Sequence, residues 1–292
     1  MNNINAILLV VCAMAAFTVE DAFIKHLSGV MPVGQILLLL GLGTCAIFAV
    51  AARLQGQRLF APAAWRGPFL MRMLTEGGAA MAFTTSLSLV DLSVVAAVFQ
   101  VTPLAITLGA ALFLGEAVGW RRWSAIVVGF MGVLLIIRPG LDGFEPAALL
   151  VLVAVVCVAA RDLITRRMDV TVSSVVISFQ GFAASVLAGP ILLLSSGRGL
   201  VALDAWHSLL VLGTMIFSAL GYYGIVAAMR MGEASVVTPF RYTRLLFSIL
   251  AGVLVFRERP DLLTLGGAGL IIATGLYTVL RERKLARRAG VM

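Results

Sequence analysis

Residues 91–116 read DLSVVAAVFQVTPLAITLGAALFLGE, and residues 233–258 read EASVVTPFRYTRLLFSILAGVLVFRE. The two stretches lie 142 residues apart, from 91 to 233, and at that offset a Ser-Val-Val triplet recurs. An acidic residue begins each stretch and a glutamate ends it, at Glu116 and Glu258. Between these ends both are almost continuously apolar, which predicts a long buried or membrane-spanning helix in each. The chain therefore contains an internal repeat.

The composition of the whole chain agrees with a membrane protein. Of 292 residues, 61% are hydrophobic and only 12% are charged, and the mean hydropathy is +1.06. Soluble domains are about 45–50% apolar and about 25% charged, and a spanning helix needs about 20 apolar residues. We expect an all-α polytopic protein with ten transmembrane helices, since barrel strands would be shorter and would alternate polar with apolar residues. The ten apolar segments are 4–26, 33–52, 68–89, 92–114, 122–138, 147–164, 173–194, 207–229, 233–256 and 262–280.

The repeat divides these segments into two groups of five. We expect a first repeat at 1–140 and a second at 141–292, which ends in a basic tail. Because five is odd, the two repeats enter the membrane with opposite orientation. Inverted repeats of this kind are typical of transporters that work by alternating access around a site near the midplane.

The basic residues predict the orientation. With the N-terminus in the cytoplasm, fourteen of the 22 lysines and arginines fall on the cytoplasmic side. Five fall on the opposite side, namely Lys25, Arg138, Arg198, Arg257 and Arg259. The positive-inside rule therefore predicts both termini in the cytoplasm of a bacterial-type inner membrane. The net charge of +8 comes from these scattered residues and the tail, so we expect a lipid bilayer and no nucleic acid as partner.

Three stretches resemble a known family. They are EDAFIKHLSGVMPVGQI at 20–36, the region 86–140 from SLSLVDLSVV to LLIIRPG, and the region 228–277 from AMRMGEASVV to IIATGLY. The last two are similar to the paired EamA-type repeats of the drug/metabolite transporter superfamily. The resemblance implies ten helices and export or exchange of small metabolites, most often amino acids. Relatives often carry an arginine where this chain has Leu40. The role of that arginine is therefore absent from this chain or belongs to another residue.

Other function classes fit less well. A membrane enzyme would need a reactive cluster, but His26 and His207 lie far apart in sequence and the three cysteines lie inside apolar segments. We predict no catalytic residue, metal or cofactor, and no GxxxxGK[ST] loop for ATP occurs. A monomeric secondary transporter of amino acids is expected. A permease or importer of a bulkier metabolite, such as a flavin, a nucleoside or S-adenosylmethionine, remains the alternative.

Ionisable residues inside the segments are candidates for gating or ion coupling, because each costs about 2.5–3.5 kcal/mol at the bilayer centre. Asp21 with Lys25 and Arg72 with Glu76 are each spaced i,i+4, so each pair shares one helix face. Glu20 has no evident partner on its own helix and is a candidate for a proton or for a substrate amine. The alternative is that the two charges of each pair only neutralise each other near a helix end, which eases insertion into the membrane.

Polar and aromatic residues of the repeated stretches predict the substrate site. Arg241 and Arg244 are three residues apart, so they share a helix face, and a guanidinium group can hold a substrate carboxylate. At the repeat offset, Phe99 and Gln100 match Arg241 and Tyr242. The other candidates are Tyr222, Tyr223 and Gln180. The alternatives are an arginine paired with a carboxylate to lock a conformation, and tyrosines placed at the membrane interface.

Prolines and glycines in the segments predict local geometry. Pro103 and Pro239 lie in equivalent segments, where each should free a backbone carbonyl and bend its helix. The bend either exposes backbone to a substrate or is a simple kink. Two glycine pairs predict close helix packing. These pairs are Gly129 with Gly132, and Gly266 with Gly269.

Overall fold

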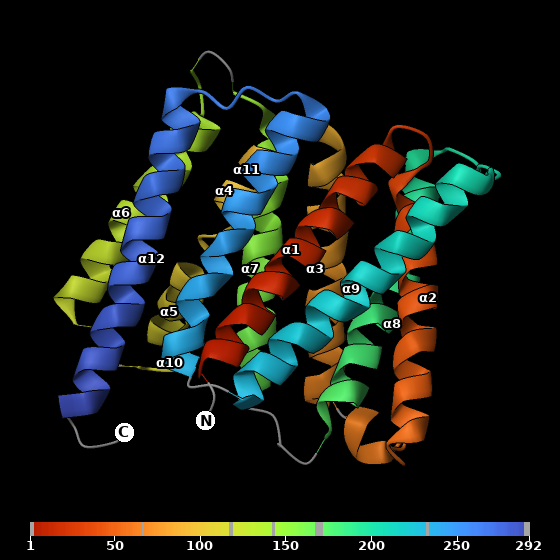
Figure 1. The fold of residues 1–292 in the computed structure, drawn as a ribbon, viewed down its shortest axis with the longest axis horizontal. Coiled ribbons are helices and arrows are strands. Elements are labelled where there is room, and N and C mark those ends of the chain that lie inside the picture. The colour runs from red at the N-terminus through yellow and green to blue at the C-terminus, as the bar shows by residue number, and fades with distance from the viewer. Residues whose placement is uncertain are drawn as a thin grey trace. The chain divides into compact units, whose positions relative to one another are not determined.

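The computed structural model describes residues 3–65, 67–116, 119–141, 144–166, 172–231 and 234–288. Every regular element in these ranges is a helix (Figure 1). Glu233, which the repeat aligns with Asp91, lies outside the described residues, as does the end of the basic tail beyond residue 288.

All ten predicted segments correspond to helices, so the all-α polytopic fold is confirmed. Within the described ranges, nine spans have the length and hydropathy needed to cross a membrane. The remaining predicted segment is α3, which is 23 residues long and carries Arg72 and Glu76. In chain order the helices are α1 (Asn3–Ser28), α2 (Val33–Leu54), η1 (Pro62–Trp65), α3 (Gly67–Leu89), α4 (Leu92–Phe99), α5 (Thr102–Phe113), α6 (Trp120–Ile137), η2 (Pro146–Ala148), α7 (Leu149–Arg166), α8 (Ser174–Ser196), α9 (Ala205–Met231), α10 (Ala234–Val237), η3 (Thr238–Tyr242), α11 (Thr243–Phe256) and α12 (Leu262–Arg288).

The chain folds into two compact units. Unit 1 comprises Met1–Thr18, Asp91–Leu149 and Gly221–Met292, and unit 2 comprises Val19–Val90 and Leu150–Leu220. Each unit therefore draws helices from both halves of the sequence. Helices α1 and α9 each begin in one unit and end in the other. This spatial division differs from the sequence division at 140, which remains a prediction about the repeats.

In unit 1, α6 and α12 lie side by side (Figure 1) and approach closely at glycines. A Cβ atom on Gly132 would lie 2.8 Å from the carbonyl oxygen of Gly267, and one on Gly129 would overlap a neighbouring leucine. The predicted role of Gly129 and Gly132 is confirmed. The prediction for Gly266 and Gly269 is wrong, because both face open space and Gly267 makes the contact instead.

In unit 2, α2 and α8 are the corresponding close pair (Figure 1). A Cβ atom on Gly189 would lie 2.7 Å from the carbonyl oxygen of Gly34. Any side chain at either position would force the two backbones apart. Small residues thus bring the helices together, as is common where lipid supplies no hydrophobic driving force between them.

Two helices of unit 1 are interrupted at equivalent places. The first interruption separates α4 from α5, which begins at Thr102 with Pro103 in its first turn. The second is the 3-10 helix η3, which contains Pro239 and joins α10 to α11. Proline lacks an N–H donor and clashes with the preceding turn, so each helix restarts at the proline instead of continuing. The sequence predicts a bend at each proline, and the structure shows a full interruption at both.

Candidate functional site

The two helix interruptions meet in unit 1. Gln100 lies between α4 and α5, and its Nε2 donates a hydrogen bond to the carbonyl oxygen of Arg241 in η3, at 3.3 Å. Interrupted helices leave backbone groups available to a ligand, and transporters commonly bind substrate where such helices meet. We use the name break site for Phe17, Phe99, Gln100, Arg241 and Arg244.

Arg244 is half-buried at the start of α11 and lies over two aromatic rings. Its guanidinium carbon is 5.1 Å from the centroid of Phe17 and 5.7 Å from that of Phe99. Each such contact contributes about 0.5–2 kcal/mol, depending on how far water is excluded. The two rings therefore offset much of the penalty of about 2.5–3.5 kcal/mol for an arginine inside a span.

The two arginines of this helix face differ. Arg241 is exposed, and its contact in the break site is the hydrogen bond that its backbone carbonyl oxygen accepts from Gln100. Arg244 brings its side chain over the rings. The structure thus distinguishes two residues that the sequence treats alike.

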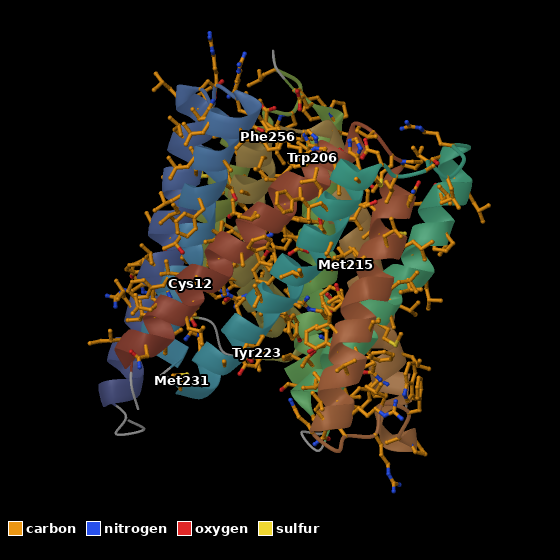
Figure 2. All side chains as sticks on the ribbon, turned by 45° about the vertical axis from the view of Figure 1, so that its right-hand side comes forward. Cys12, Trp206, Met215, Tyr223, Met231 and Phe256 are labelled. Carbon is orange, nitrogen blue, oxygen red and sulfur yellow. The ribbon has the colours of Figure 1, made fainter. Side chains whose placement is uncertain are left out.

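Tyr242 is buried in the packing of α12 and does not belong to the break site. Its side chain is 6% exposed, and a methyl group placed on Gly275 would overlap its hydroxyl. Among the described residues, that hydroxyl has no hydrogen-bond partner. On α9, Tyr222 is half-buried. Tyr223, which Figure 2 labels, is 66% exposed. High exposure fits the interfacial alternative for Tyr223, and a substrate contact for these tyrosines stays a prediction.

Gln180 lies in unit 2, on α8, and is completely buried. It neighbours Gly181, where a Cβ atom would lie 3.6 Å from the carboxylate of Glu76 on α3. Gly181 thus faces Glu76, whereas the structure places Gln180 outside the unit that holds the break site.

Four charged side chains form a network between α3 and α7 in unit 2. We call Arg72, Glu76, Arg161 and Asp162 the charge cluster. Arg72 Nη2 lies 3.3 Å from Glu76 Oε2, and Arg161 Nη1 lies 2.8 Å from Glu76 Oε1. Arg161 Nε also donates to Asp162 Oδ1 at 2.8 Å. The predicted Arg72–Glu76 pair is confirmed, but Glu76 also binds an arginine from another helix.

The remaining gating candidates lie on the second part of α1, also in unit 2. Glu20 and Asp21 are both buried, and both take part in interactions. Lys25 Nζ donates to the carbonyl oxygen of Val90 at 2.6 Å, so Lys25 reaches the connection that follows α3. Their roles in gating or coupling stay predictions.

Sequence reasoning missed three residues of these sites, namely Phe17, Arg161 and Asp162. Phe17 precedes the charged residues of α1 by three positions and looks like an ordinary apolar residue of a span. Arg161 was counted only as a basic residue on the cytoplasmic side. Its i,i+4 partner, Thr165, donates to the Arg161 carbonyl oxygen, whereas its own guanidinium binds a residue 85 positions earlier. No local spacing could have revealed that contact.

Comparison with known proteins gives the family. The model of the EamA-like transporter family matches residues 4–138 and again residues 145–280. An S-adenosylmethionine uptake transporter of Rickettsia conorii is 32% identical over 64% of this chain and 62% of its own length. A riboflavin transporter of Vibrio cholerae is 30% identical over 67% of this chain and 65% of its own. The matched region thus spans slightly less than two thirds of these relatives.

Two further matches cover nearly the whole chain. A pseudopaline exporter of Pseudomonas aeruginosa is 25% identical over 96% of this chain and 97% of its own length. A solved crystal structure has the same fold, with a TM-score of 0.66 at 19% identity over 96% of this chain and 98% of the other. Since the family model matches two stretches that together cover most of the sequence, the chain belongs to the EamA-like transporter family.

Proposed function

We propose that this chain is a secondary transporter of small metabolites that carry an α-amino acid group, such as free amino acids or S-adenosylmethionine. The observation that supports this proposal is Arg244, which lies over Phe17 and Phe99 where two interrupted helices meet. The proposal keeps the sequence-based expectation of an amino-acid substrate and extends it to larger molecules with the same group.

The geometry of Arg244 suits a carboxylate. Stacking on an aromatic ring uses the face of a guanidinium group, whereas its N–H donors all lie in the plane. Two parallel donors of such a group can bind both oxygens of a carboxylate. The rings of Phe17 and Phe99 offer apolar surface beside that group for the rest of the substrate.

The names of the relatives suggest two substrates, which the break site would bind with different contacts. S-adenosylmethionine, named for the Rickettsia conorii relative, carries a carboxylate and an adenine ring. Riboflavin, named for the Vibrio cholerae relative, carries a flat ring and no carboxylate. Aromatic residues suit either ring, but a guanidinium group in the site favours the substrate with the carboxylate.

We further propose that the repeats 1–140 and 141–292 alternate access to the site, with both termini in the cytoplasm of a bacterial-type inner membrane. Fourteen basic residues against five support that orientation. Export is the direction typical of amino-acid carriers in the family, and uptake is the direction named for the S-adenosylmethionine relative. Glu20, Asp21 and the charge cluster supply the ionisable groups for coupling to a gradient.

Transport in proteoliposomes tests the proposal. Uptake of labelled S-adenosylmethionine, riboflavin and an amino-acid panel is measured with and without a pH gradient. We then compete the transported compound with its decarboxylated analogue and repeat the assay with Arg244→Ala. Loss of the bidentate contact should lower uptake about tenfold or more. Arg198→Ala, at an exposed position between α8 and α9, is the control and should change uptake little.

Several outcomes would overturn the proposal. Flux of riboflavin without flux of any compound that bears an amino acid would favour the alternative. Equal competition by the decarboxylated analogue would remove the carboxylate contact. Unchanged uptake in Arg244→Ala would remove Arg244 from the site. Flux that does not respond to the pH gradient would exclude proton coupling through Glu20.

A further inference from the structure

Phe17 of the break site contacts two helices besides its own. The guanidinium carbon of Arg244, on α11, lies 5.1 Å from the centroid of its ring. On α9, the ring lies against Gly221, where a Cβ atom would come within 2.9 Å of it. All three residues belong to unit 1. The position of the ring therefore depends on α9 as well as on α11.

A side chain at 221 would meet the face of the Phe17 ring. The added Cβ atom would lie 2.9 Å from Cδ1, 2.9 Å from Cε1 and 3.0 Å from Cγ. Three neighbouring ring atoms at nearly equal distances place this carbon over the face of the ring and not beside its edge. Because Cγ lies on the axis about which the ring turns, rotation of the ring cannot relieve the contact. Only a shift of the whole ring, or of α1, makes room for an alanine.

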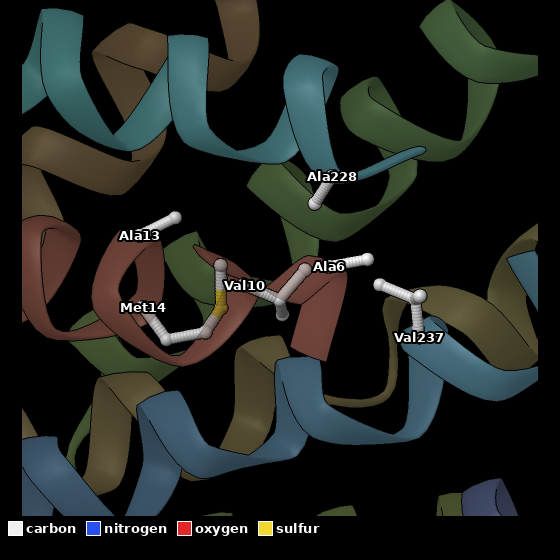
Figure 3. Close-up of a cluster of buried hydrophobic side chains, with 6 residues drawn as sticks. All are labelled: Ala6, Val10, Ala13, Met14, Ala228 and Val237. Carbon is white, nitrogen blue, oxygen red and sulfur yellow. The ribbon is translucent and has the colours of Figure 1, made fainter. Parts of the chain in front are cut away.

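The N-terminal half of α1 is held between α9 and α10 by a cluster of apolar side chains (Figure 3). α9 contributes Ala228 and α10 contributes Val237, and both are 0% exposed. Phe17 is among the half-buried residues that pack against this cluster. A shift of α1 would open gaps in close packing, which is costly. The members from α1 itself are Ala6, Val10, Ala13 and Met14, none more than 3% exposed.

The spacing of α1 and α9 is set at a second glycine, Gly224, one turn from Gly221. A Cβ atom on Gly224 would lie 2.9 Å from the Cβ atom of Ala13. By contrast, the three atoms nearest to a Cβ atom on Gly221 all belong to the ring of Phe17. A side chain at 224 would thus separate the two helices, whereas one at 221 would displace the ring.

We propose that Gly221 is a positioning residue that sets the size of the substrate group bound beside Arg244. With glycine at 221, the Phe17 ring lies back against α9. A larger residue there would push the ring toward α11 and narrow the space next to the guanidinium group. The bulkier members of the proposed substrate class therefore require glycine at this position. The proposal rests on the proposed function, since the break site must hold the substrate, but its test needs no known substrate.

Two arginine reagents of different size test the proposal. Methylglyoxal and phenylglyoxal are both α-dicarbonyl compounds that condense with guanidinium groups, and they differ in carrying a methyl group or a phenyl ring. The purified protein is treated with either reagent in detergent, and peptide mass spectrometry measures the modification rate of Arg244. Arg198, which is exposed between α8 and α9, is the internal reference. The thermal midpoint of each variant shows whether it folds.

Gly221→Ala should discriminate against the larger reagent. We expect the phenylglyoxal rate at Arg244 to fall about tenfold, which corresponds to about 1.4 kcal/mol, and the methylglyoxal rate to fall about twofold at most. Adding Phe17→Leu should restore the ratio of the two rates, because the smaller side chain makes room for the added methyl group. Phe17→Trp, which enlarges the ring against Gly221 instead, should also lower the phenylglyoxal rate selectively, and it decides the question if Gly221→Ala does not fold.

Two other glycines supply the controls. Gly266 is an exposed helical glycine of α12 with open space around an added Cβ atom, so Gly266→Ala should leave both rates unchanged. Gly224→Ala should separate α1 from α9, and Phe17→Leu should not correct it, because the overlap is with Ala13. A merely structural role of Gly221 predicts that Gly221→Ala behaves like Gly224→Ala, without rescue by Phe17→Leu.

Three results would overturn the proposal. They are equal changes in the two rates, a loss that Phe17→Leu does not restore, and no modification of Arg244 by either reagent in the parent, since its guanidinium group would then be closed to a ligand. Failure here is distinguishable from failure of the proposed function, because the reagents report on the space beside Arg244 whichever compounds are transported. If the reagents discriminate as expected and no amino-acid compound is transported, Gly221 still sets that space and the substrate proposal alone falls.

Discussion

Unit 1 and unit 2 each hold arginines inside apolar helices, but they stabilise them differently. In unit 2, Arg72 and Arg161 both bind Glu76, and Arg161 also binds Asp162. In unit 1, the guanidinium group of Arg244 lies over the rings of Phe17 and Phe99. The first arrangement uses fixed carboxylates and the second uses aromatic faces.

This difference favours Arg244, over Arg72 and Arg161, as the arginine that binds a substrate. A guanidinium group that binds fixed carboxylates, as Arg161 binds Glu76 and Asp162, commits several of its N–H donors to them, so such contacts stabilise one conformation. An aromatic ring attracts the cation without occupying its N–H donors. The charge cluster is therefore expected to stabilise unit 2, and Arg244 to bind substrate at some expense of stability.

The largest expected effect is that of Glu76→Gln. The substitution leaves Arg72 and Arg161 facing a neutral amide, while the side chain of Arg72 is only 7% exposed. Removing one partner of a buried ion pair costs about 3–5 kcal/mol. Because Glu76 is 21% exposed, we expect the free energy of unfolding to fall by about 2–3 kcal/mol, after allowance for solvent screening. Thermal or denaturant unfolding in detergent measures the change.

Asp162→Asn is the matched control for Glu76→Gln. Asp162 binds the same arginine, Arg161, at 2.8 Å, but its side chain is 37% exposed. Solvent-exposed ion pairs contribute about 0–1 kcal/mol, so the control should be much milder. Equal losses in the two variants would show that the bridging position of Glu76 between two arginines adds nothing to stability.

The next effect concerns Arg244→Met, which removes the cation and keeps an unbranched side chain against the rings. A sulfur near an aromatic ring is itself favourable by about 0.3–1.5 kcal/mol, so methionine keeps a favourable contact with Phe17 and Phe99. We expect the free energy of unfolding to change by less than about 1 kcal/mol, or to rise. Transport should nevertheless fall about tenfold or more.

Uptake and stability of Arg244→Met, measured together, decide whether Arg244 binds substrate or locks a conformation. Uptake lost with stability retained would support a substrate-binding role. A loss of stability as large as that of Glu76→Gln would show that Arg244 locks a conformation, and the contrast between the units would disappear. Arg244→Lys sharpens the comparison, because lysine keeps the charge and lacks the paired planar donors.

Much of this fold could be predicted from the sequence, because its signals are local. Each span is a run of about 20 apolar residues, and the two interruptions occur at Pro103 and Pro239. The helix ends just before Glu116 and Glu258 follow from the 142-residue offset. The Arg72–Glu76 pair follows from i,i+4 spacing on one helix.

Contacts between distant helices could not be predicted in this way. Arg161 binds Glu76 across 85 positions, and Glu258 binds Ser93 across 165. The composition of the two units also depends on which helices pack together, since α1 and α9 are each divided between them. The face that a helix turns toward its neighbour also depends on distant contacts. Gly267, and not Gly266 or Gly269, faces α6, because the packing of the two helices selects the contacting face.

The smallest expected effect comes from another arginine–carboxylate pair, Arg138 with Asp261 in unit 1. The side-chain hydrogen bond from Arg138 lowers the pKa of Asp261 from 3.8 to about 2, and the backbone N–H of Thr264 adds to it. A lowered pKa in the folded state gives stability that is fully present above pH 3.8 and is lost as the pH falls through 2. Asp261 is 50% exposed, so solvent screening keeps the contribution below about 1 kcal/mol.

Asp261→Asn should therefore lower the thermal midpoint slightly at pH 6, and its difference from the parent should shrink between about pH 4 and pH 2 as Asp261 becomes protonated. Glu76→Gln, measured beside it at pH 6, should have a much larger effect. The three carboxylates would then rank by burial, with Glu76, which binds two arginines, above Asp162 and Asp261. If Asp261→Asn destabilised the chain as much as Glu76→Gln, exposure would not explain the contrast between the units, and the stability assigned to the charge cluster would need another cause.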